Sequence, residues 1–155
     1  MLRPLFFEYP NDPGSWTIDD QYLFGPDLLV APMFTNGDRR RVYAPPGAWI
    51  DYQSGRVYQG PAWHEIQAGQ IPLVLLVRNH SVLPHIKVAQ STKDMDWTNV
   101  ELRVFSTDDA QVNGLFTKPG GDLQTLSLVP RGRSFVLTAD PQNGKVKWTI
   151  NKMNR

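Results

Sequence analysis

The sequence predicts a mainly β protein made of antiparallel β-sandwich units. Gly and Pro are frequent, with 12 Gly and 13 Pro among 155 residues, which indicates many turns. Short apolar runs recur between these turn residues at a spacing typical of sandwiches. Val100, Leu102 and Val104 alternate with Glu101, Arg103 and Phe105, and apolar and polar residues alternate at 145–150, as in strands with one face in water.

The first 26 residues differ from the rest because they contain the one helical pattern. Residues 3–9 form an apolar, aromatic run that predicts a strand, and the turn-forming residues 10–14 close it. A helix of about two turns is expected over 17–24. Thr17 would cap it, Asp20 stands in a capping-box-like position, and Gly25-Pro26 would end it.

From residue 28 onward every signal is β. The run 71–77 is apolar throughout, as expected of a strand covered on both faces. Strands are predicted at 28–34, 40–44, 49–52, 63–67, 73–77, 100–106, 123–129, 134–138 and 145–150. Turns are predicted at 36–38, 45–47, 113–114, 119–122 and 143–144. Residues 90–94 are polar without interruption and mark the expected boundary between a first and a second β unit.

Charge and composition narrow the classes of partner. The formal net charge is +1, too small to attract nucleic acid or an anionic membrane, so neither is expected as a partner. No apolar window is long enough to span a membrane. The N-terminal residues lack the apolar core of a signal peptide, which predicts a cytoplasmic rather than a secreted protein. The sequence has no cysteine, and its composition leaves the oligomeric state open.

No pattern in the sequence predicts a metal, a cofactor or a nucleophile. Gly-x-Ser-x-Gly, the phosphate-binding Gly-rich loop and His-Glu-x-x-His are all missing. His64, His80 and His85 are not spaced as metal ligands on a helix. The segment from Asp94 to Asp96 begins like a calcium loop, but Asn99 occupies the position of the required glycine.

Paired carboxylates are considered separately because they perform glycosidic chemistry. Most of them have a structural explanation as turn formers, as acids in a first helical turn, or as residues after a strand end. Glu8 lies inside an apolar run, where an unpaired charge would be costly, so it is expected to form a structural ion pair. We therefore predict no catalytic residue in this sequence. The candidate pairs are Glu8 with Asp12, Asp19 with Asp20, Asp94 with Asp96, and Asp108 with Asp109.

The tryptophans suggest a second kind of site, since an indole face can stack on a sugar ring. Trp49 and Trp148 lie in strand patterns that predict core packing. Trp16 and Trp97 lie beside turn residues and are the candidates for exposed, sugar-stacking positions.

Three stretches of the sequence resemble one known family. Residues 3–33, RPLFFEYPNDPGSWTIDDQYLFGPDLLVAPM, resemble the end of the catalytic barrel in glycoside hydrolase family 31, the α-glucosidases and α-xylosidases. Residues 47–51 are similar to its Gly-x-Trp-x-Asp hairpin, and 71–84 to its Ile-Pro…Val-Arg-Gly-Gly-x-Ile-Leu-Pro segment, with Asn79-His80 in place of the two glycines. The likeness covers about the first 85 residues, and 84–105 look more like the α-xylosidase branch.

The resemblance implies a domain order and a mechanism. Residues 1–26 would be the strand–helix end of a (β/α)8 barrel, 27–92 a proximal C-terminal β-sandwich, and 93–155 part of a distal β unit. In the family, an Asp nucleophile and an Asp general acid on earlier barrel strands perform retaining hydrolysis. No carboxylate here matches either motif. The barrel of a longer parent enzyme would be the partner, α-linked oligosaccharides its substrates, and the chain alone is expected to be inactive.

Two alternatives stay open from the sequence. The protein could be a self-standing carbohydrate-binding module that uses Trp16 or Trp97 as a platform, or a purely structural β-sandwich.

Overall fold

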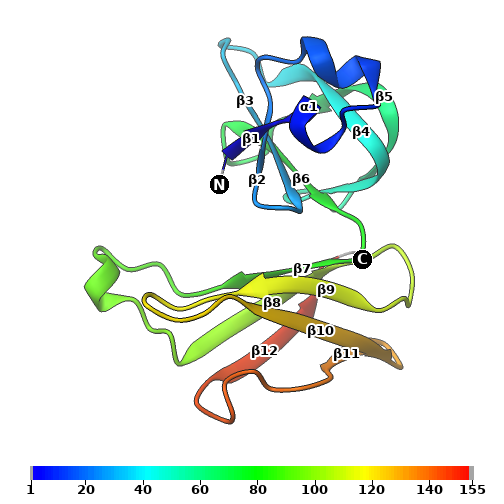
Figure 1. Ribbon diagram of the computed structural model, residues 1–155. Coiled ribbons are helices and arrows are strands. Elements are labelled where there is room, and N and C mark those ends of the chain that lie inside the picture. Colours follow the sequence, from blue (N-terminus) through cyan, green and yellow to red (C-terminus); the bar gives the residue numbers. More distant parts are fainter. Residues whose placement is uncertain (1, 154–155) are drawn as a thin grey trace. The chain divides into compact units, whose positions relative to one another are not determined.

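The computed structural model describes residues 2–153 and separates into two compact units (Figure 1). The first unit ends at Asn79 and the second begins at His80. Each unit contains one six-stranded sheet and a hydrophobic core of its own. This confirms the predicted mainly β, sandwich-type fold. None of the helices within residues 2–153 is long and apolar enough to cross a membrane.

The sheet of the first unit is antiparallel throughout, with the strand order β1-β2-β3-β6-β4-β5. Strands β3 and β6 lie where the sequence predicts them. The elements of the first unit are β1 Leu2–Pro4, α1 Leu5–Glu8, the 3-10 helix η1 Pro13–Thr17, β2 Tyr22–Phe24, β3 Leu28–Pro32, β4 Arg39–Asp51, β5 Val57–Gln67 and β6 Leu73–Arg78.

The sheet of the second unit is mixed, with the order β11-β10-β9-β7-β8-β12. Its β7–β9 and β8–β12 pairs are parallel and its other pairs are antiparallel, so this sheet departs in part from the antiparallel pairing predicted. Strands β8 and β12 can pair in parallel because a long stretch of chain connects them. The elements are β7 Ser81–His85, the 3-10 helix η2 Thr92–Asp94, β8 Asn99–Phe105, β9 Val112–Phe116, β10 Gln124–Arg131, β11 Ser134–Leu137 and β12 Lys147–Lys152.

The core of the first unit is built around a fully buried tryptophan, Trp49. Its indole Nε1 donates to the carbonyl oxygen of Pro45 at 2.8 Å, so its polar atom is satisfied inside the core. The predicted core role of Trp49 is therefore confirmed. The buried residues of this cluster are Leu5, Ile18, Leu23, Leu29, Ala31, Val42, Tyr43, Ala44, Trp49, Ile66, Val74 and Leu76.

The core of the second unit follows from the alternation seen in the sequence. Val100, Leu102 and Val104 of β8 are all buried, which confirms the inward face predicted there. The other face is not simply wet, because Glu101 and Arg103 are half-buried and Phe105 is fully buried. Trp148 is half-buried against this core and meets the Phe116 ring edge-on at 5.2 Å. The buried residues of the cluster are Val82, Val100, Leu102, Val104, Val112, Phe116, Leu126, Leu128, Phe135 and Val146.

The predicted strand over residues 3–9 was wrong beyond Pro4. After the short β1, the backbone makes one helical turn, α1, which the Tyr9 amide closes by donating to the Leu5 carbonyl at 2.9 Å. Leu5 turns into the core while Phe7 stays 70% exposed. Pro4 suits this change because its fixed φ is compatible with a helix start.

The predicted helix over residues 17–24 was also wrong. The helical residues lie earlier, in η1, where the Asp12 carboxylate accepts from the Gly14 amide as the N-terminal cap. The backbone is already extended at Ile18, and β2 pairs with β1 on one side and β3 on the other. Sheet pairing and burial of Leu23 outweigh a weak local helix signal.

Two predicted turns lie inside strands. Residues 45–47 form an irregularity within the long strand β4, where the register with β5 shifts between Ala44 and Gly47. Asn113-Gly114 belongs to β9, and Gly114 packs against β7 so closely that a Cβ would fall 2.2 Å from the Val82 carbonyl oxygen. Here glycine serves close backbone approach rather than a turn.

The observed division between units lies ahead of the predicted boundary at 92/93. Residues 81–85, placed by the sequence in the domain 27–92, form β7 and pair with β8 of the second unit. The polar residues 90–94 are the connection between these two strands and include η2. In this structure β1 and β2 belong to the sheet of the first unit. The assignment of residues 1–26 to the end of a barrel therefore stays a prediction.

Candidate functional site

Large apolar side chains gather on the N-terminal segment of the first unit. Leu2, Phe7 and Trp16 are 60%, 70% and 61% exposed. The Phe6 ring contacts both aromatic neighbours, with ring centroids 5.0 Å from Phe7 and 5.8 Å from Trp16, on which it stacks. We call Leu2, Phe6, Phe7 and Trp16 the N-terminal aromatic surface. Exposed apolar groups that touch one another are typical of an interaction site.

The backbone below this surface is held by hydrogen bonds. The Trp16 Nε1 donates to the Pro10 carbonyl oxygen at 3.1 Å. The buried Ser15 hydroxyl bonds to the carbonyl oxygens of Tyr9 and Asp12 at 2.9 and 2.8 Å. These bonds orient the Trp16 ring and connect η1 to the residues before it.

Tyr43 of β4 anchors the same segment from the sheet. Its hydroxyl donates to the Asp12 carboxylate, with oxygen–oxygen distances of 2.8 and 2.7 Å. Gly14 crosses directly over it, and a Cβ there would fall 2.4 Å from the Tyr43 hydroxyl oxygen. Burial, with the Asp12 carboxylate beside it, raises the pKa of Tyr43 to about 12. Tyr43 is therefore neutral at physiological pH and acts as a hydrogen-bond donor.

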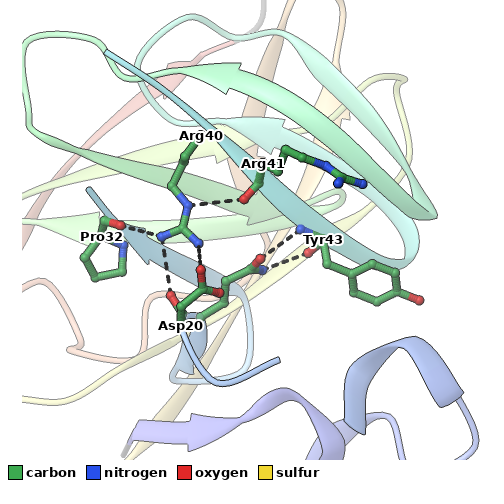
Figure 2. Close-up of polar contacts among 6 residues, drawn as sticks. Asp20, Pro32, Arg40, Arg41 and Tyr43 are labelled. Carbon is green, nitrogen blue, oxygen red and sulfur yellow. Dashed lines mark hydrogen bonds and ion pairs between the residues drawn. The ribbon is translucent and has the colours of Figure 1, made fainter. Parts of the chain in front are cut away.

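A second anchor joins the residues after η1 to β3 and β4 (Figure 2). The guanidinium of Arg40 donates to the Asp20 carboxylate, to the Pro32 carbonyl and, at 3.2 Å, to the Arg41 carbonyl. The buried amide of Gln21 bonds to both backbone groups of Tyr43, accepting from its N–H at 2.8 Å and donating to its C=O at 2.9 Å. Gln21 thus takes the place of a neighbouring strand.

An open groove of about 640 Å³ lies beside the N-terminal aromatic surface. Its walls combine aromatic rings with polar groups of both charges, which suits a partner with apolar faces and hydroxyl or amide groups. It is lined by Leu2, Arg3, Pro4, Phe6, Trp16, Thr17, Ile18, Asp19, Gln21 and Tyr22.

Three carboxylates of the N-terminal segment have structural partners, whereas Asp19 lines the groove itself. Glu8 forms an ion pair with Arg3 at 2.8 Å, and both side chains are one-third exposed, which confirms the predicted structural pairing. Asp12 holds Gly14 and Tyr43, and Asp20 holds Arg40. Groups already engaged in this way are poorly placed to act as acid, base or nucleophile.

The two predicted sugar-stacking tryptophans belong to different units. Trp16 is highly exposed on the N-terminal aromatic surface, whereas Trp97 of the second unit is half-buried after η2. Next to Trp97, the Asp96 carboxylate accepts from the Thr98 amide and hydroxyl and from the Asn99 side-chain amide. These hydrogen bonds lower the pKa of Asp96 to about 2. They organise a turn, and Trp97 takes no part in the groove that Trp16 lines.

The sequence did not single out Trp63, although it is 46% exposed on β5. The Arg41 guanidinium lies 5.0 Å from its ring centroid and the Tyr43 ring 5.5 Å away. The register pairs Tyr43 with Trp63 across β4 and β5, so the two rings share one face of the sheet. Correct placement of β5, which was predicted to begin only at residue 63, would have revealed this position.

The histidines do not assemble a metal site. Within residues 2–153 no group of three or more His, Cys, Asp or Glu side chains could hold an ion. His80 pairs with Asp108 at 2.8 Å, and burial lowers the pKa of His85, whose Nδ1 lies 3.0 Å from the Leu83 carbonyl oxygen. These contacts serve the strand ends of the second unit.

The protein thus combines a mainly β, sandwich-type fold with an exposed apolar surface on its N-terminal segment. The sequence profile of the glycosyl hydrolase family 31 C-terminal domain matches residues 1–83. The protein belongs to glycosyl hydrolase family 31 and contains its C-terminal domain.

Named relatives and a solved structure agree with this family. The sequence is 38% identical over 97 residues to α-glucosidase 2 of Bacillus thermoamyloliquefaciens, covering 62% of this chain and 12% of the relative. It is 30% identical over 117 residues to an α-xylosidase of Lactiplantibacillus pentosus, covering 73% and 15%. The cycloalternan-forming enzyme of Listeria monocytogenes, solved with a pentasaccharide substrate, matches with a TM-score of 0.77 at 26% identity, over 98% of this chain and 15% of that one.

The 155 residues thus span less than a fifth of the length of these three proteins. They are similar to the C-terminal part of larger family 31 enzymes, whose catalytic barrel belongs to the parent protein.

Proposed function

We propose that this protein is the C-terminal β region of a retaining α-glycosidase of α-xylosidase or α-glucosidase type, and that it braces the catalytic (β/α)8 barrel of that enzyme. The N-terminal aromatic surface carries this proposal. Leu2, Phe7 and Trp16 lie at the end that would follow a barrel, and each is at least 60% exposed. A barrel packed on them would remove a costly apolar contact with water.

The way this surface is anchored supports a bracing role. The residues that present it are tied to β4 through Asp12, Gln21 and Asp20. A partner seated on the surface would therefore be connected to the sheet through these side-chain bonds. A barrel seated there would gain support on the side where its last elements end.

The reaction itself would be performed outside these 155 residues. Retaining hydrolysis uses two carboxyl groups about 5 Å apart, one as nucleophile and one as general acid and base. Glu8, Asp12 and Asp20 of the N-terminal segment hold Arg3, Tyr43 and Arg40 instead. Among the described residues, Asp19 is the one carboxylate that lines the groove, so the groove does not hold such a pair. The β region would contribute support, and the barrel would contribute the carboxylates and the α-linked oligosaccharide site.

The isolated protein provides a direct test. It should not hydrolyse aryl α-xylosides or α-glucosides, and it should bind a hydrophobic dye and self-associate through the N-terminal aromatic surface. The triple variant Leu2→Ser, Phe7→Ser, Trp16→Ser should lower both dye binding and the sedimentation coefficient. A matched control replaces Val57, Leu115 and Val136, exposed by 43%, 40% and 38% elsewhere, and should leave both unchanged. Turnover by the pure protein would overturn the proposal.

A second function is favoured by Trp16 and its groove. The open indole ring, with Arg3, Asp19 and Gln21 nearby, could stack on a sugar ring and bond to its hydroxyl groups. Calorimetry with xylosyl and glucosyl oligosaccharides distinguishes this function from bracing. Sugar binding predicts heat that is lost in Trp16→Ala and kept in Trp97→Ala, whereas bracing alone predicts no heat at millimolar ligand.

A further inference from the structure

Three Asn-Gly dipeptides occur in the sequence, at residues 36–37, 113–114 and 143–144. Such pairs are chemically labile because the glycine nitrogen, unhindered by a Cβ, can reach the carbonyl carbon of the preceding asparagine side chain. The attack requires a free glycine N–H and a backbone able to leave the extended or hydrogen-bonded conformation. The structure places the three pairs in different surroundings, and these decide which of them can react.

The pair at Asn113 is held in a strand. Asn113 lies in β9 opposite Ser127 of β10, and its side-chain oxygen accepts from the Ser127 hydroxyl at 2.7 Å. Gly114 is buried against the Val82 carbonyl. Both the sheet and the close packing keep the Gly114 nitrogen away from the Asn113 side chain.

The pair at Asn143 is held in a tight turn. Asn143 has a left-handed backbone with φ of 50°, and its N–H donates to the Asp140 carbonyl at 3.2 Å. The Gly144 N–H, the group that would attack, donates to the Asp140 carboxylate at 2.5 Å. A charge-assisted hydrogen bond of this kind withholds the nucleophile.

The pair at Asn36 has neither protection. It lies in the exposed bend between β3 and β4, where residues 34–39 are all exposed. Among residues 2–153 the structure gives neither Asn36 nor Gly37 a hydrogen-bond partner, and the space around Gly37 is open, with the nearest atom 3.7 Å from a Cβ built there. The Gly37 nitrogen is free to approach the Asn36 side chain.

We propose that Asn36 is a site of spontaneous deamidation and isoaspartate formation in the folded protein, and that Asn113 and Asn143 are protected. The Gly37 nitrogen bonds to the carbonyl carbon of the Asn36 side chain, and the bond from that carbon to the amide nitrogen breaks, which releases ammonia. Water then opens the cyclic imide at either carbonyl, which leaves an aspartyl or an isoaspartyl residue. The amide becomes a carboxylate, so the formal net charge of +1 falls to zero.

Peptide mass spectrometry after incubation of the whole protein at mildly alkaline pH tests the proposal. Trypsin separates the three sites, because Arg39, Arg131 and Lys145 end the peptides that contain them. In the native protein only the Asn36 peptide should gain the mass of an amide-to-acid conversion and the isoaspartyl form. In urea, all three peptides should convert at similar rates, since folding is what protects the other two.

A variant provides the matched control. Gly37→Ala fits the open space at this bend and should slow conversion of Asn36 roughly tenfold, because a Cβ removes conformations that only glycine adopts readily. Native conversion of Asn113 or Asn143 as fast as Asn36, or an Asn36 that converts only in urea, would overturn the proposal.

Discussion

The two units contain sheets of the same size, yet they differ in what holds their outermost segments. In the first unit, residues 2–24 are fastened by side chains that bond to backbone, led by Gln21 and Arg40. In the second unit, the outermost strand β12 is held by a parallel ladder with β8 and by core contacts of Trp148. The first arrangement leaves apolar rings outside the core, whereas the second packs them against it.

This difference decides which large side chains face the core and which face the solvent. A strand added to a sheet places every second side chain inward, so the second unit packs Trp148 and Ile150 against its core. The short turn α1 and the 3-10 helix η1 do not alternate, and Phe7 and Trp16 stay in solvent. The irregular segment of the first unit is therefore the part suited to contact another body.

The largest expected losses of stability come from core substitutions, which test whether the two units have independent cores. Trp49→Ala removes a fully buried ring and its bond to Pro45, and should destabilise the first unit by about 3–5 kcal/mol. Leu126→Ala, in the second core, should cost about 2–5 kcal/mol. Urea unfolding with hydrogen exchange measures both. Each variant should lower protection in its own unit; equal loss in both units would show that they fold as one.

A smaller effect tests the fastening of the N-terminal segment. Gln21→Ala leaves the buried N–H and C=O of Tyr43 without their partners, which should cost about 1–3 kcal/mol. The exposed Gln59 on β5 gives the control, and Gln59→Ala should be close to neutral. If Gln21→Ala is as mild as the control in thermal unfolding, the segment is held by packing alone.

The smallest effects are pH effects of opposite sign in the two units. The pKa of Tyr43 is raised from 10.0 to about 12. Its contribution to the free energy of unfolding is therefore complete below pH 10 and is lost as the pH rises towards 12. Asp96 has its pKa lowered from 3.8 to about 2, so its contribution is present above pH 3.8 and is lost as the pH falls towards 2. Tyr43→Phe and Asp96→Asn should each flatten one limb of the stability curve.

Titration of each group by NMR checks these directions. A Tyr43 that ionises with an ordinary tyrosine pKa, or an Asp96 that protonates with an ordinary aspartate pKa, would show that the hydrogen bonds described around them do not persist in solution.

The sequence predicted the regular parts of this fold better than its irregular ones. β3, β6 and β8 follow from apolar runs or alternation, which record burial directly. The segment before them was misread because its conformation depends on distant partners. η1 is stabilised by Tyr43 of β4, which lies far along the sequence and leaves no local pattern. β7 and β9 were missed since Pro84 and Gly114 look like turn residues, although each lies in a sheet.

The sequence predicted only part of the candidate site, because exposure of a side chain also depends on distant residues. Trp16 was identified from its turn-like surroundings and is exposed, whereas Trp97 shares such surroundings and is half-buried. Local composition does not distinguish them, because exposure depends on which elements fold over each ring. The family resemblance over the first 85 residues was confirmed by the match to residues 1–83.

Hydroxyl-radical footprinting of a chimera tests the central claim most directly. Residues 1–155 would replace the corresponding C-terminal segment of the Bacillus α-glucosidase, and labelling would be compared with that of the isolated protein. Phe7 and Trp16 should be labelled strongly in the isolated protein and protected in the chimera, while Leu123 of the second unit, 65% exposed, should be labelled equally in both. Equal labelling of Trp16 in the two proteins would contradict the account, since no barrel would then cover the N-terminal aromatic surface.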